Sequence, residues 1–187
     1  MSCYRLLLSW KETAAAVSSS RFVCVFRLRE CPTMFLDSPL LEELGKKVGS
    51  AAARMQKLQG IAALIRKSGD FRWVGLYEVD KQAAQVVNLV WDGASAPEYP
   101  RFPIGEGLTG SAIQERQVVN VGDVASDARY LTAFDSTRSE IIVPIFDEAR
   151  SNVVGTIDVE SEHLNAFDEQ TKRVLVACAD VIAPLWR

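Results

Sequence analysis

The sequence predicts an α+β fold in which an antiparallel sheet carries the N-terminal and C-terminal helices on one face. Apolar residues recur at three- and four-residue spacings over residues 40–67 and again over residues 168–186, as on one side of a helix. Between them lie short alternating runs that end in a hairpin pattern. For the order helix, two strands, short helix, strand, long loop, hairpin, helix, this packing is the natural one.

The first helical pattern covers Leu40–Lys67 and ends at Gly69-Asp70. Glycines at positions 45, 49 and 60 leave open whether it is a single unbroken helix, because glycine is unfavourable inside helices. Two strands follow, Phe71–Val79 and Gln85–Trp91. A polar turn at residues 80–82 joins them, as in a hairpin.

The middle of the chain is less regular. Ala94–Pro100 is a loop with two prolines, Gly107–Arg116 is a short helix, and Val118–Val121 is a short strand. Gly122–Arg138 is polar and rich in turn-forming residues. Because long irregular segments in compact domains are often functional, this loop is a candidate part of a site.

A hairpin and a helix complete the predicted fold. Ser139–Phe146 and Val153–Ser161 are the hairpin strands, and Asp168 or Asn165 caps a helix that runs to about Trp186. The apolar face expected for this helix consists of Val174, Ala177, Cys178, Val181, Ile182 and Leu185.

Charge is distributed unevenly along the chain. Residues 1–33 contain five basic and two acidic residues, whereas the remainder contains 16 basic and 22 acidic ones. An acidic body without a basic stripe argues against nucleic acid as a partner, and no apolar run approaches a membrane span. We expect residues 1–33 to be a disordered extension or a misassigned start, with an organellar transit peptide as the alternative, and residues 34–187 to form a single domain.

Cysteine and histidine are sparse. Cys3, Cys24 and Cys31 lie in the extension, Cys178 lies near the C-terminus, and His163 is the single histidine. This set does not provide the spacing of a structural zinc site, so we expect no metal and no cofactor. Because no disulfide framework is indicated, we expect a cytoplasmic protein from a reducing compartment.

The stretch GEGLTG at residues 105–110 has the spacing G-x-G-x-x-G. A dinucleotide fingerprint needs a buried strand before the first glycine and an acid at a later strand end. Here three prolines precede it within residues 97–103, and Glu106 stands where a pyrophosphate would approach. Two roles stay open: the free N–H groups at the helix start could bind a ligand oxygen, or the glycines only permit a tight turn.

Strand periodicity places acids and aromatic rings together. Asp158 and Glu160 share one face of their strand, Glu140 lies across the hairpin, and Trp73 and Tyr77 share a face on either side of Gly75. The glycine is expected to leave space above the sheet. Three carboxylates with two rings suit an ammonium group; alternatively, the acids only occupy a solvated sheet face.

Residues 40–186 resemble the GAF domain family, and within it the free methionine-(R)-sulfoxide reductases. The resemblance rests on five stretches of the chain: FRWVGLYE (71–78), IGEGLTGSA (104–112), SEIIVP (139–144), GTIDVES (155–161) and NAFDEQ (165–170). It implies a small-molecule pocket between the sheet and the loops. The expected ligand-binding residues are Trp73, Tyr77, Tyr99, Gly107, Thr109, Glu140, Asp158 and Glu160.

The resemblance also exposes a departure. The cysteine positions of those reductases fall on Tyr99, Thr109 and Ala133, none of which can act as a thiol nucleophile, and Cys178 is expected to pack in the core. We therefore expect a non-catalytic binding or sensor protein for a free amino acid or similar amine, with no catalytic residues.

Three further expectations accompany this interpretation. The alternative function is a reductase that uses a displaced Cys24 or Cys31. A cyclic nucleotide is a poor guest, because the pocket is rich in acids. A homodimer could form through the helix or helices at residues 40–67 and the C-terminal helix.

Overall fold

The computed structural model describes residues 38–131 and 134–186, all of which belong to one compact unit. The predicted extension, residues 1–33, lies outside the described residues, as do Cys3, Cys24, Cys31 and Ala133. No helix in the described part of the chain is long and apolar enough to cross a membrane.

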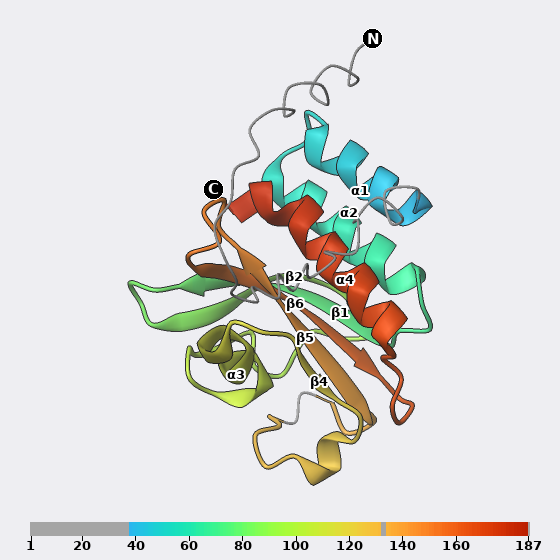
Figure 1. The fold of residues 1–187 in the computed structure, drawn as a ribbon, viewed down its shortest axis with the longest axis vertical. Coiled ribbons are helices and arrows are strands. Elements are labelled where there is room, and N and C mark those ends of the chain that lie inside the picture. The colour runs from blue at the N-terminus through green and yellow to red at the C-terminus, as the bar shows by residue number, and fades with distance from the viewer. Residues whose placement is uncertain (1–37, 132–133, 187) are drawn as a thin grey trace, which may run out of the picture. The chain divides into compact units, whose positions relative to one another are not determined.

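A six-stranded antiparallel sheet with the order β3-β2-β1-β6-β5-β4 forms the centre of the fold (Figure 1). Its strands are β1 (Trp73–Asp80), β2 (Gln85–Gly93), β3 (Arg101–Pro103), β4 (Val119–Val121), β5 (Ser139–Phe146) and β6 (Val153–Ser161). The predicted α+β class and antiparallel sheet are therefore confirmed.

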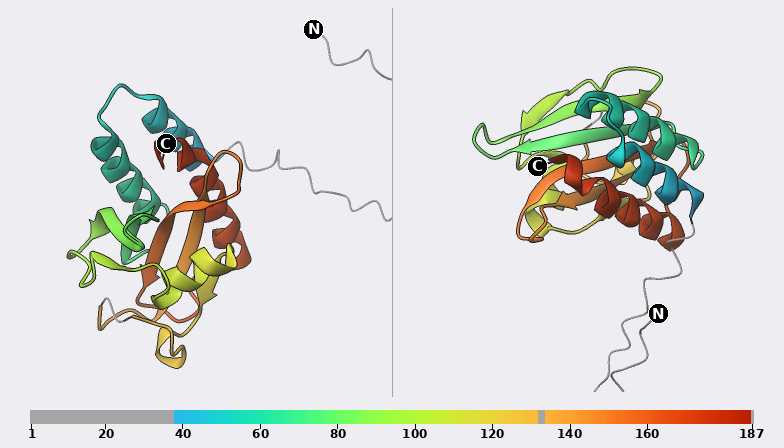
Figure 2. Two further views of the ribbon diagram at one scale, coloured as in Figure 1. Left: turned by 90° about the vertical axis from the view of Figure 1, so that its left-hand side faces the viewer. Right: turned by 90° about the horizontal axis from the view of Figure 1, so that it is seen from above.

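In the described part of the chain, three helices lie on one face of this sheet and a fourth lies on the other (Figures 1 and 2). The first group is α1 (Pro39–Gly49), α2 (Arg54–Lys67) and α4 (Glu169–Ile182), and the fourth helix is α3 (Gly107–Glu115). α2 packs on β1 and β2, while α4 packs on β5 and against α1. The terminal helices thus share one face, as predicted.

The pleat of the strands divides the sheet into an apolar face and a mixed face. Leu76, Ile141 and Ile157 point into the main core beneath the helices and are fully buried. Ile142 points the other way and packs against α3 through Leu108 and Ala112. The larger core therefore fixes the sheet, and the opposite face is available for a site.

Several element predictions need correction or completion. The pattern at residues 40–67 is two helices, because residues 50–53 interrupt it. Asp168, and not Asn165, caps α4: its Oδ1 accepts a hydrogen bond from the Thr171 N–H at 2.7 Å. β3 was not predicted; its proline is tolerated because the strand is at the sheet edge. A short 3₁₀ turn, Val124–Ser126, lies in the predicted irregular segment.

The buried face of α4 differs from the predicted one. Cys178 and Ile182 are buried as expected, but Leu175 and Ala179 are buried beside them. The other predicted residues are half-buried, because α4 lies against both the sheet and α1 and its apolar surface faces two neighbours.

Candidate ligand pocket

The register of the three central strands brings the predicted acids side by side. Glu140 on β5 lies opposite Glu160 on β6, and Asp158 lies two residues before Glu160 on the same face. On the other side of β6, Trp73 pairs with Glu160 and Gly75 pairs with Asp158. Residues distant in sequence thus form one cluster on the face opposite α1, α2 and α4.

All three carboxylates are buried. The exposed fractions of Glu140, Asp158 and Glu160 are 8%, 4% and 2%. The alternative of a solvated sheet face is therefore wrong. Burying a charge is costly unless it is paired, so the protonation states of these acids depend on their surroundings.

Few groups compensate the buried charge. The Thr109 hydroxyl donates to Asp158 Oδ2 at 3.0 Å, and the Thr137 hydroxyl donates to Glu160 Oε2. Among the described residues, neither Asp158 Oδ1 nor the Thr156 hydroxyl has a hydrogen-bond partner, although this hydroxyl lies close enough to Asp158 to lower its pKa. Asp158 Oδ1 is therefore open to a hydrogen bond from a ligand.

Burial raises the pKa of each acid. Burial raises the pKa of Asp158 to about 7, although the hydroxyls of Thr156 and Thr109 act in the opposite direction and lower it. Burial likewise raises the pKa of Glu160 to about 7, although Thr137 and the Arg72 guanidinium counteract it. The pKa of Glu140 is raised well above its usual value by burial and by the neighbouring Glu160 and Asp158. Near neutral pH the free pocket therefore retains protons.

Aromatic side chains form the wall next to the acids. The Trp73 and Tyr77 ring centroids are 6.4 Å apart, and the Tyr77 ring meets Phe102 edge-on at 5.8 Å. The Trp73 indole N–H donates to the Ser95 carbonyl at 3.1 Å, which fixes the ring. The prediction that Gly75 leaves open space above the sheet is wrong. A Cβ at this position would collide with the Trp73 and Tyr77 rings. The glycine instead lets the two rings lean together.

The start of α3 forms another side of the pocket. Gly107 has a left-handed φ of 72°, and a Cβ at this position would meet the Leu131 side chain. Thr109, the third residue of the helix, donates a hydrogen bond to Asp158. The tight-turn role of the glycine is therefore real, and the N-terminal end of α3 also borders the pocket.

The pocket unites all eight predicted residues with four others. It holds about 440 Å³ of space, part of it open to solvent, and its lining is Trp73, Tyr77, Pro97, Tyr99, Phe102, Gly107, Leu108, Thr109, Leu131, Glu140, Asp158 and Glu160. Tyr99 is 44% exposed. Phe102 and Leu131 were missed because loops and an edge strand, rather than strand periodicity, bring them to the pocket.

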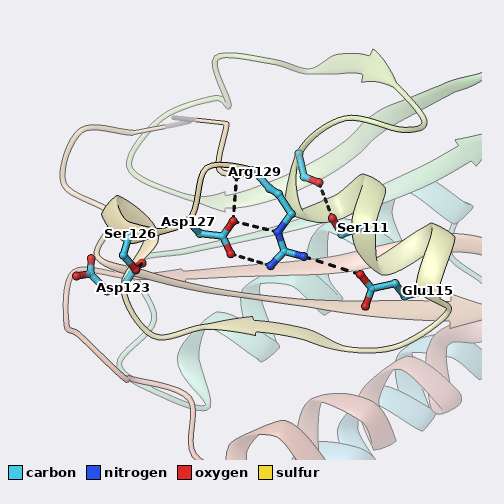
Figure 3. Close-up of polar contacts among 7 residues, drawn as sticks. Ser111, Glu115, Asp123, Ser126, Asp127 and Arg129 are labelled. Atoms are coloured by element: carbon cyan, nitrogen blue, oxygen red, sulfur yellow. Dashed lines mark hydrogen bonds and ion pairs between the residues drawn. The ribbon is translucent and has the colours of Figure 1, made fainter.

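Ion pairs hold the long loop beside α3. Arg129 lies between Asp127, at 2.7 Å from its Nη2, and Glu115 of α3, at 3.8 Å from its Nη1 (Figure 3). Asp123 Oδ1 accepts from the Ala125 N–H and starts the 3₁₀ turn. These contacts anchor the part of the loop that precedes Leu131.

No thiol lies at the pocket within the described residues. Cys178, the one cysteine among them, is buried in the core on the helical side, and burial raises its pKa to about 12. Its predicted packing role is confirmed. His163 is exposed and lies 3.6 Å from Asp70. The described residues also contain no group of histidine, cysteine or acidic side chains that could hold a metal.

Comparison with known proteins agrees with this geometry. The sequence profile of the GAF domain family matches residues 41–186. GAF domain-containing protein A of Dictyostelium discoideum is 30% identical over 65% of this chain and 74% of its own length. The free methionine-R-sulfoxide reductase of Escherichia coli is 29% identical over 62% of this chain and 68% of its own. A crystal structure of the free methionine-R-sulfoxide reductase from Neisseria meningitidis in complex with its substrate is 29% identical, with a TM-score of 0.72 over 79% of this chain and 86% of that one.

Fold and pocket together define an α+β domain with a pocket on the sheet face opposite its terminal helices. The chain belongs to the GAF domain family, whose members are typically small-molecule-binding or sensor domains.

Proposed function

We propose that this GAF domain binds a free amino acid or a similar amine-bearing metabolite as a sensor, without thiol catalysis. The observation that carries the proposal is the cluster of three buried carboxylates beside aromatic rings. Among the described residues that line the pocket, none is cationic. An ammonium group is the complement of such a site.

Each predicted residue has a role in this proposal. Glu140, Asp158 and Glu160 hold the ammonium group, and Asp158 Oδ1 accepts one of its N–H bonds. Trp73 and Tyr77 attract the cation through their ring faces. At the rim of the pocket, the amides of Gly107 and Thr109 bind the opposite end of the ligand, and Tyr99 covers the mouth.

Charge compensation provides the binding energy in this proposal. In the free protein the carboxyls keep protons, because burial and mutual repulsion disfavour their ionised forms. A bound ammonium favours the ionised forms, so the acids lose protons as the ligand enters. The ionised carboxylates repel a phosphate group, so the pocket selects amines over phosphates.

The test is a thermal shift titration with free amino acids, methionine sulfoxide and simple amines. A ligand at 100 times its Kd stabilises the folded state by about 2.7 kcal/mol, so the Tm is expected to rise by roughly 5–10 °C. Glu140→Gln should abolish the shift. Glu43→Gln, a matched change on the exposed side of α1, should retain it. The absence of a shift with every ligand at millimolar concentration contradicts the proposal.

A free methionine-R-sulfoxide reductase is the second candidate, supported by the similarity to two such enzymes. It needs a thiolate to attack the sulfoxide and a second thiol to close a disulfide. The only cysteines besides the buried Cys178 are Cys3, Cys24 and Cys31. Consumption of the (R)-sulfoxide with dithiothreitol, lost in a variant with these three changed to serine, would establish the enzyme. Consumption that persists in this variant would exclude these cysteines as the thiols, and no consumption by the unaltered chain supports the binding role.

We further propose that the protein is cytoplasmic and that nucleic acid is not among its partners. We also propose a homodimer, formed through the helices of residues 39–67 and α4. Analytical ultracentrifugation tests the dimer. A sedimentation coefficient that corresponds to a single 20.7 kDa chain would contradict it.

A further inference from the structure

A second cleft lies where the chain leaves α3 and enters β4, at the β5 side of α4. It holds about 680 Å³ of space, part of it open to solvent. Its lining is Arg116, Gln117, Val118, Val143, Pro144, Phe146, Arg150, Lys172, Val176 and Asp180. None of these residues lines the pocket described above.

Two arginines converge in this cleft from different loops. Arg116 ends α3 with a φ of 56°, and Arg150 lies in the β5–β6 turn with a φ of 53°. Their guanidinium carbons lie 5.8 and 4.9 Å from the centre of the Phe146 ring. Arg116 also donates to the Arg150 carbonyl at 2.5 Å, which ties the two loops together. Left-handed backbone is uncommon and unfavourable for non-glycine residues, so the surrounding structure holds the backbone of both residues in this conformation.

The positive charge of the cleft is only partly compensated. Arg150 pairs with Asp180 at 2.8 Å, and Lys172 lies 3.4 Å from Glu169. Arg116 has a backbone carbonyl as its partner and no acidic one in the described part of the chain. Asp180 is the single acid among the described lining residues, against three cations. This excess attracts an anion.

The floor of the cleft is apolar. Val143 and Pro144 are buried there, and Val176 of α4 is half-buried beside them. β4 pairs only with residues 140–142 of β5, so the edge beyond residue 142 has no partner strand in the described part of the chain. Pro144 has no N–H to offer there, which disfavours an added strand. A compact ligand with an apolar body fits this floor better than an extended peptide does.

We propose that this cleft binds a small organic oxyanion, whose phosphate or carboxylate group is held by Arg116 and Arg150 and whose apolar body lies on Val143, Pro144 and Val176. The planar guanidinium fork binds either oxyanion through two parallel hydrogen bonds. Lys172 contributes a third positive charge at the α4 side. This site is independent of the ammonium pocket and of its ligand.

The test is isothermal titration of the full chain at low ionic strength with phenyl phosphate, benzoate and inorganic phosphate. Phenyl phosphate or benzoate should bind, and inorganic phosphate should bind more weakly because it lacks the apolar body. The stronger of the two organic anions identifies the oxyanion. Arg116→Gln should weaken binding about tenfold, as expected for losing a charged hydrogen-bond pair, and added salt should weaken it further.

Arg173→Gln is the matched control, because this exposed arginine follows Lys172 on α4 but does not line the cleft. It should leave the Kd unchanged. Equal weakening by Arg116→Gln and Arg173→Gln, or no binding of any of the three anions, overturns the proposal. Neither result bears on the ammonium pocket, since the thermal shift with amines is expected to persist in Arg116→Gln.

Discussion

In the Asp158 side chain, the cost of burying a charge is only partly offset by hydrogen bonds. One of its oxygens accepts a hydrogen bond from the Thr109 hydroxyl, while the other is buried without a partner among the residues that the structure describes. A buried polar atom without a partner retains the full cost of its desolvation. The rise of the Asp158 pKa to about 7 is the electrostatic expression of that cost. In the free protein this residue therefore lowers stability, and in the proposed function the ligand offsets that cost.

Asp158→Asn is expected to stabilise the free protein and to abolish ligand binding. The amide keeps an oxygen for the Thr109 hydroxyl, removes the buried charge, and offers an N–H donor to the neighbouring acids. We expect the Tm to rise by a few degrees at pH 8, since each 1 kcal/mol corresponds to about 2–4 °C in a chain of this size. Differential scanning calorimetry measures it, with Glu43→Gln as the control. A lower Tm for Asp158→Asn would mean that the free protein already compensates this charge.

Single residues of the pocket divide into two groups by how far sequence could predict them. Glu140, Asp158 and Glu160 were predicted to lie near one another, because the strand period of two fixes their side of the sheet. Thr137 was not predicted. It approaches Glu160 from the irregular loop, whose path depends on tertiary contacts rather than on a local repeat.

Strand β1 shows how an element can be predicted correctly while its packing is not. Its alternation placed Trp73 and Tyr77 on the pocket side, as observed. The space expected over Gly75 does not exist, because the two rings lean toward each other above the glycine. Side-chain rotamers, which a sequence pattern does not specify, decided the outcome.

Gly75→Ala is expected to destabilise the protein by about 1–3 kcal/mol, the usual range for overpacking a well-packed site. The new methyl group would lie 2.8 Å from Tyr77 Cε2 and closer still to the Trp73 ring, so both rings must move. Chemical denaturation measures the loss. The control is Gly45→Ala in α1, where a Cβ meets nothing within 4 Å and the helix should gain up to about 1 kcal/mol. Equal stability of the two variants would show that the wall of the pocket adapts freely.

The helices were less well predicted than the strands for a related reason. The interruption at residues 50–53 was left open, since glycine lowers helix propensity without fixing where a helix stops. The sequence pattern predicted one apolar face for α4, although the helix packs against both the sheet and α1. Element type thus followed from periodicity, whereas helix ends and buried faces followed from packing.

At the scale of the whole molecule, the two faces of the sheet have opposite effects on stability. The helical face buries the apolar core, and the other face buries three acids. The fold class and this two-sided arrangement were predictable because apolar and polar residues alternate through the second half of β6, and because the same period of two places Trp73 and Tyr77 on one face of β1. How deeply the acids are buried was not, since α3 and the loops provide the cover.

This arrangement predicts an unusual dependence of stability on pH. Asp158 and Glu160 have pKa values of about 7 in the folded state, against about 4 in an unfolded chain. A carboxyl with a raised folded-state pKa contributes stability that is complete below pH 4 and is lost as the pH rises through 7. The exposed acids Asp147 and Asp168, whose pKa values are lowered by hydrogen bonds from Asn152 and Thr171, act oppositely and lose their contribution below about pH 4. Maximum stability is therefore expected near pH 5.

Between pH 5 and 8 the free energy of unfolding of the free protein should fall, by up to about 1.4 kcal/mol per pH unit for each acid below pH 7, and the Tm should fall with it. Melting curves in buffers of constant ionic strength measure it, and His163→Gln removes the contribution of the single histidine. Asp158→Asn should flatten the slope. A bound amine should do the same, because it favours the ionised carboxyls, and its affinity should consequently increase from pH 6 to pH 8. A Tm that rises steadily to pH 8 in the free protein would mean that the three carboxyls are already ionised and compensated, and the electrostatic basis of the binding proposal would be lost.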